Sequence, residues 1–181
     1  FRNIWNGDIL NIRITVFSFD ILSSLVFSFG LFFFNKKKYN LNNIHFLVLF
    51  FLTYIGFNLS TPPLYGVYSY VTFNRQLILI SFGFLLYALQ TDNNYLKNTL
   101  VLVSGILIGS LFFIMITNVP IFLLIILFIF YYERKMNRIY VFCMGLILSS
   151  ISYFLFVETF SIFVNHFVEL FTQPTSGTIP A

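Results

Sequence analysis

The sequence is divided into long apolar runs by short segments that carry most of its charged residues. An α-helix needs roughly 20 consecutive apolar residues to cross the hydrocarbon core of a bilayer. Apolar runs of 13 to 21 residues cover residues 14–34, 44–59, 71–89, 99–117, 120–132 and 139–157. We therefore expect an all-α fold, a polytopic transmembrane helix bundle of about six spans.

The composition agrees with this fold class. Hydrophobic residues make up 59% of the chain and charged residues 9%, whereas roughly a quarter of the residues of a soluble domain are charged. There is no glycine-rich phosphate loop and no basic-aromatic stripe, so no cofactor and no nucleic-acid partner is expected. His45 and His166 are far apart, which predicts no metal site, and Cys143 in its apolar run is expected to be a buried structural thiol.

The ends of the chain are more polar than its middle. Residues 1–13 are expected to be the end of an extracytoplasmic loop, and residues 172–181 another such loop. Residues 158–171 lie between the last span and the loop at 172–181. Polar side chains recur in them at helical spacing, which predicts an amphipathic helix in the membrane interface. Because the chain begins with Phe1, we expect it to be part of a longer protein.

Two internal features concern helix packing. A single helix over residues 99–132 would be roughly 50 Å long, too long for a bilayer, so Asn118 and Pro120 predict a tight hairpin. Gly105 and Gly109 form a GxxxG pattern, which is typical of closely packed membrane helices.

Basic residues predict the orientation, since they stay in the cytoplasm. One set of segments holds Lys36, Lys37, Lys38, Lys97, Arg134, Lys135 and Arg138, and the other holds only Arg2, Arg13 and Arg75. We expect the first set to be cytoplasmic in a multi-pass protein of the bacterial inner (plasma) membrane.

Four ionisable residues are candidates for a site. Asp20 is the only acidic residue well inside a span, and such groups suggest function, although a polar neighbour could also solvate it. Arg13 and Arg75 stand at the outer ends of spans, where a guanidinium can bind a lipid phosphate or simply anchor its helix. Asp8 is either a catalytic base or a solvated loop residue.

Aromatic residues gather in the outer loop after Pro62 and Pro63. Tyr65 and Tyr68 are candidate contacts for a sugar, and they are equally suited to the aromatic belt of a membrane protein.

Two stretches resemble the GT-C superfamily of polytopic glycosyltransferases, which includes protein O-mannosyltransferases and bacterial lipid A glycosyltransferases. The first, residues 6–13 with Gly7 and Arg13, leads directly into a span. The second runs from Ser104 to Pro120 and is similar to the family's glycine-containing helix followed by a short turn. The threonine–lysine pair common after that helix is replaced by Thr117 and Asn118.

The resemblance implies transfer of a sugar from a polyprenyl-phosphate donor to an acceptor at the extracytoplasmic face. Membrane lipid and the lipid-linked sugar are then the partners, and Arg13 and Arg75 would hold the donor phosphate. The resemblance places the catalytic acidic residue upstream of Phe1, with Asp8 and Asp20 as weaker candidates. The alternatives are an O-antigen polymerase or ligase, a transporter, and a non-catalytic membrane subunit. The sequence does not indicate the oligomeric state.

Overall fold

The computed structural model describes residues 9–59, 70–114, 119–134 and 136–157, and every regular element in them is helical. The elements are α1 (Ile9–Tyr39), α2 (Asn43–Leu59), α3 (Tyr70–Gln90), α4 (Asn94–Ile114), α5 (Val119–Tyr132), the 3₁₀ helix η1 (Met136–Arg138) and α6 (Ile139–Phe156). The prediction of an all-α helix bundle is confirmed. The predicted interfacial helix at 158–171 lies outside the described residues.

Among the described residues, four helices are long and apolar enough to cross a membrane, and the chain is an integral membrane protein. These stretches are Ile14–Lys36, Thr72–Gln90, Asn94–Phe113 and Met136–Phe156. The apolar helices Asn43–Gly56 and Val119–Tyr132 are shorter, so a crossing by α2 or α5 stays a prediction.

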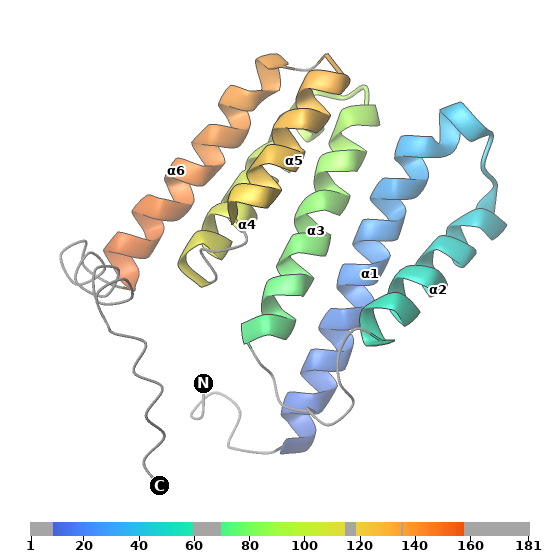
Figure 1. Ribbon diagram of the computed structural model, residues 1–181, viewed down its shortest axis with the longest axis horizontal. Helices are drawn as coiled ribbons and strands as arrows, with labels where there is room; N and C mark the ends of the chain where they lie inside the picture. Colours follow the sequence, from blue (N-terminus) through green and yellow to red (C-terminus); the bar gives the residue numbers. More distant parts are fainter. Residues whose placement is uncertain (1–8, 60–69, 115–118, 135, 158–181) are drawn as a thin grey trace, which may run out of the picture.

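The helices run up and down, and most of them lie in one row (Figure 1). Contacts join α2 to α1, α1 to α3, α3 to α4, and α4 to α6, while α5 packs across α4. The turns after α1, α3 and α5 meet at one end of the bundle, which we call the basic end because Lys36, Lys38, Lys97, Arg134 and Arg138 lie there. This clustering matches the alternation expected from the basic residues of the sequence.

Asparagine side chains fix where two helices begin. Asn42 Oδ1 accepts hydrogen bonds from the backbone N–H groups of Ile44 (3.1 Å) and His45 (3.2 Å) at the start of α2. Asn93 Oδ1 accepts in the same way from Tyr95 N–H (3.0 Å) and begins α4 at Asn94. The helix therefore begins five residues before the predicted span at Thr99, because this cap satisfies backbone donors that the polar segment would otherwise leave free.

The apolar core lies in the half of the bundle formed by α3 to α6. Buried side chains from all four helices meet there: Leu85, Ala88, Leu89, Val101, Ile108, Leu111, Val119, Ile126, Phe130 and Phe142. The Phe130 and Phe142 rings pack edge to face with centroids 6.1 Å apart. α5 thus joins the bundle through its buried apolar face, although it is the shortest of the six α-helices described.

Each neighbouring pair of helices in the row shares at least one polar contact between side chains or from a side chain to the backbone. These contacts are Ser28 to Thr53 (α1–α2, 3.2 Å), Gln76 to Asp20 (α3–α1, 2.6 Å), Ser81 to the Ser104 carbonyl (α3–α4, 3.1 Å) and Ser110 to Ser149 (α4–α6, 3.1 Å). In lipid, polar contacts of this kind hold helices together.

Glycines bring two pairs of helix backbones into direct contact. A Cβ on Gly83 of α3 would lie 2.5 Å from the Val26 carbonyl oxygen of α1, and Gly30 faces Gly83 in return. Gly105 of α4 and Gly145 of α6 face each other in the same way. The predicted packing role of the GxxxG glycines is confirmed for Gly105, and Gly109 packs against Ser149.

The expectation of a buried thiol at Cys143 is wrong. The side chain is exposed on the surface of the helix bundle. On α6, Phe142 and Gly145 occupy the buried positions, and Cys143 falls between them on the outward face. An apolar run in a membrane helix includes lipid-facing positions, so hydrophobic surroundings in the sequence do not imply burial in the protein.

The α1–α3 contact predicts a specific cost for an added methyl group. We expect Gly83→Ala to lower the free energy of unfolding by about 1–3 kcal/mol, because its Cβ meets a rigid backbone carbonyl. Gly56→Ala is the matched control, since nothing lies within 4 Å of a Cβ there. It should be neutral or stabilising by up to about 1 kcal/mol. Thermal unfolding in detergent, followed by circular dichroism, measures both, and equal effects would contradict the packing.

Candidate functional site

A polar cluster lies between α1 and α3, towards the end of the bundle opposite the basic end. The two helices are parallel, since Asp20 meets Gln76 near their starts and Phe33 meets Tyr87 near their ends. Asp20 is 8% exposed and Gln76 is fully buried. Gln76 Nε2 donates to Asp20 Oδ1 at 2.6 Å and lies 3.4 Å from the Val16 carbonyl oxygen.

The spacing of polar residues on α1 explains this local structure. Asp20, Ser23 and Ser24 lie within a little more than one helical turn and are all buried, so they share the side of α1 that is covered by its neighbours. Ser23 Oγ donates to the Asp20 carbonyl oxygen at 3.1 Å. Among the described residues, the Ser24 hydroxyl and Gln76 Oε1 have no hydrogen-bond partner although both are buried.

Arg75 supplies the positive charge of the cluster. It is half-buried in the second turn of α3, and its charge attracts the Asp20 carboxylate. A buried carboxylate in a bundle surrounded by lipid needs such compensation. The structure therefore brings together two residues that the sequence had marked separately, Asp20 and Arg75.

The other predicted site residues are not placed in this cluster. Arg13 belongs to α1 and precedes Asp20 by seven residues, so its Cα lies roughly 10 Å closer to the start of the helix. The predicted site residues Asp8, Tyr65 and Tyr68 lie outside the described residues.

Gln76 and Asn74 are buried members of the site region that the sequence interpretation passed over. Both flank Arg75 inside an otherwise apolar helix. Amide side chains within a span are themselves a signal, because each must find a hydrogen-bond partner away from water. Attention to charged groups alone missed this signal.

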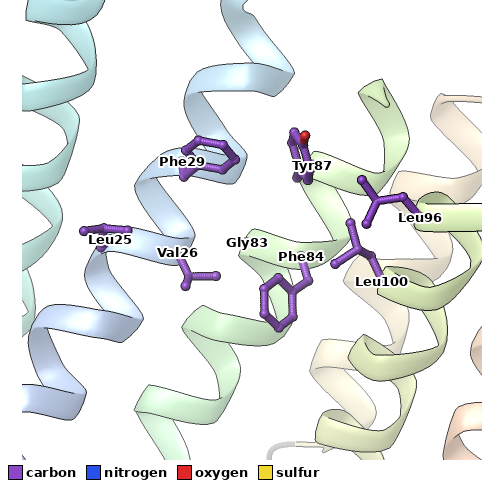
Figure 2. A pocket seen from close by; sticks show the side chains of 8 residues that line it. All are labelled: Leu25, Val26, Phe29, Gly83, Phe84, Tyr87, Leu96 and Leu100. Carbon is purple, nitrogen blue, oxygen red and sulfur yellow. The ribbon is translucent and has the colours of Figure 1, made fainter. Parts of the chain in front are cut away.

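An apolar pocket lies nearer the basic end, between α1, α3 and α4 (Figure 2). It has a volume of about 290 Å³. Its lining residues are Leu25, Val26, Phe29, Gly83, Phe84, Tyr87, Leu96 and Leu100. Arg75 and Phe84 are nine residues apart, which puts them on opposite faces of α3. The pocket and the charge of Arg75 are thus separate features.

Comparison with protein-family models, with curated proteins and with solved structures finds no match to this chain. The function of the chain is therefore inferred from the chemistry of the polar cluster.

The Asp20–Gln76 hydrogen bond predicts a measurable coupling. We expect Gln76→Met, which removes the donor but keeps the length of the side chain, to lower the free energy of unfolding by about 1.5–3 kcal/mol. Adding Asp20→Leu should recover part of this loss, because a buried polar pair can be replaced by apolar side chains at little cost. Ser18→Ala is the control, since that hydroxyl is exposed and bonds only within α1. Additive effects of the two substitutions would contradict the coupling.

Proposed function

We propose that this chain is the membrane-embedded part of a glycosyltransferase that uses a polyprenyl-phosphate-linked sugar. The transfer would take place at the extracytoplasmic face, with the basic end of the bundle in the cytoplasm of a bacterial cell. In this proposal all six helices cross the membrane, with α2 and α5 as short spans, and the phosphate of the donor binds near the starts of α1 and α3.

The observation that carries the proposal is the position of Arg75. Its guanidinium belongs to a helix of a lipid-embedded bundle, one turn and a half from the helix start, and stands beside a buried carboxyl–amide pair. A phosphate attached to a lipid would lie at this depth, where the hydrocarbon core meets the headgroups. A positive charge that is partly shielded from water binds a phosphate more strongly than one on an open surface.

The chemistry of the Arg75 guanidinium suits a phosphate leaving group. A guanidinium can donate two parallel hydrogen bonds to phosphate oxygens and stays charged at any physiological pH. Arg75 lies close enough to the Asp20 carboxyl group for its charge to act on it. Arg75, together with Arg13 one to two turns closer to the outer surface, would stabilise the charge that develops on the phosphate as the sugar leaves.

The geometry of Asp20 favours a positioning role over that of a catalytic base. The carboxyl group is 8% exposed, and one of its oxygens accepts the Gln76 hydrogen bond. A base must reach the proton of an acceptor hydroxyl directly or through one water molecule. We therefore propose that the base belongs to another part of the protein.

A transporter is the second candidate, and the buried Asp20–Gln76 pair favours it. Carboxyl groups inside membrane helices mark the ion and proton pathways of many transporters. Such a protein would bind a cation or a proton at Asp20 and would show no preference for a lipid phosphate.

Binding of a lipid phosphate separates the two candidates. We expect the chain in nanodiscs to bind a short-chain polyprenyl phosphate, and Arg75→Gln to weaken this binding by about 10- to 100-fold, because one charge-assisted contact contributes about 1.5–3 kcal/mol. Arg134→Gln is the matched control, since it removes the same charge from an exposed turn at the basic end. Fluorescence titration gives both dissociation constants.

Equal affinities for these two variants would overturn the role of Arg75. Binding of a polyprenyl alcohol as tightly as the phosphate would overturn the proposed recognition of phosphate.

A further inference from the structure

We propose that the Asp20–Gln76 pair is a proton-binding site within the membrane bundle, in which Asp20 carries the proton on Oδ2 and donates it to Gln76 Oε1. This assignment holds whether or not Arg75 binds a phosphate. It follows from the hydrogen-bonding capacity of the two side chains and from their burial.

The amide oxygen of Gln76 is a buried acceptor without a donor among the described residues. With Nε2 of Gln76 donating to Asp20 Oδ1, the amide oxygen of the same side chain has no donor among the described residues, although it is buried. The two amide atoms share one carbon, and so do the two carboxyl oxygens. A proton on Oδ2 therefore lets the two groups close a ring of two hydrogen bonds, one in each direction, and satisfies the buried acceptor.

Turning the amide over leads to the same conclusion. The oxygen and nitrogen of a glutamine amide have nearly the same shape, so the reversed orientation fits the same space. It would place Gln76 Oε1 against Asp20 Oδ1, and two oxygens 2.6 Å apart need a proton between them. A separation of 2.6 Å is also short for N–H···O and ordinary for O–H···O. Both orientations call for one proton on the Asp20 carboxyl group, on Oδ2 with the amide as placed and on Oδ1 with the amide reversed.

The neighbouring groups determine whether the protonated or the ionised form of Asp20 is favoured. Arg75 of α3 is the charged group whose field acts on Asp20, and it favours the carboxylate form. α2 also packs against α1. Its Tyr54 ring contacts Phe17, one turn before Asp20. Its other titratable side chain, His45, lies at the end of α2 far from Asp20. Burial opposes the effect of Arg75 and favours the protonated acid, because a buried carboxylate loses its hydration whereas the neutral acid loses much less.

A proton fits this site better than a metal cation. A bound Na⁺ or K⁺ needs several oxygen ligands around it, as other hard cations do, whereas Gln76 directs an N–H group at the carboxylate. One proton completes the hydrogen bonding without any further ligand. Asp20 is six residues beyond the start of the apolar span at Ile14, so roughly 9 Å of helix separates it from the membrane surface opposite the basic end.

Infrared spectroscopy with isotope-labelled aspartate tests the proposal directly. The chain contains three aspartates, Asp8, Asp20 and Asp92, and the double substitution Asp8→Asn and Asp92→Asn leaves Asp20 as the only one. Growth with aspartate carrying ¹³C at the side-chain carboxyl then labels this single group. We expect the reconstituted protein at neutral pH to show the C=O stretching band of a protonated carboxylic acid, shifted by the label.

Two further variants in this background identify the site. Asp20→Asn should abolish the labelled band. Gln76→Met should move it to higher frequency, because the acid loses the hydrogen bond to Oε1, and circular dichroism verifies that each variant is folded. A labelled carboxylate band without an acid band at neutral pH, in the folded protein, would overturn the proposal. A rise in melting temperature on replacing KCl with NaCl, with the same carboxylate band, would assign the site to Na⁺ and overturn it equally.

Discussion

Contact between helix backbones at glycines determines how the rest of this bundle is arranged. In lipid there is no hydrophobic gain from bringing apolar helices together, so association depends on packing and on polar contacts. Gly30 and Gly83 let α1 and α3 approach until the backbone of one helix touches the other. This approach fixes the register of two parallel helices, and the register brings Asp20 to Gln76 several turns away. The polar cluster is thus a consequence of a packing contact.

The two halves of the bundle are stabilised differently. Gly105 and Gly145 join α4 to α6 as the first glycine pair joins α1 to α3, but there α5 adds apolar side chains to the core, among them the buried Phe130. At the end opposite the basic end, the described part of the α1–α3 pair buries a carboxyl, amides and hydroxyls instead. Buried polar groups weaken a core unless their hydrogen bonds are complete. A bound proton or ligand therefore contributes most to stability at the end of α1–α3 opposite the basic end.

Much of the fold could be predicted from the sequence because one rule, roughly 20 apolar residues per crossing, acts on each segment separately. The helices at 43–59 and 139–156 begin and end close to the predicted spans. The start of α4 could not be read from hydropathy, since the Asn93 cap extends the helix into polar residues. The site was only half visible, since the pairing of Asp20 with Gln76 depends on which helices are neighbours. Hydropathy says nothing of neighbours, and the outward position of Cys143 was missed for the same reason.

Phosphate binding at Arg75 and proton binding at Asp20 would be linked, because each changes the charge that the other side chain experiences. Arg75 and the Asp20 carboxylate attract each other, and protonation of Asp20 would end that attraction. The guanidinium would then favour an anion from elsewhere, such as a lipid phosphate. If a proton strengthens phosphate binding in this way, phosphate must strengthen proton binding by the same factor, because the coupling free energy is reciprocal. A proton at Asp20 would thereby make recognition of an anionic lipid sensitive to the pH of the compartment that the end opposite the basic end faces.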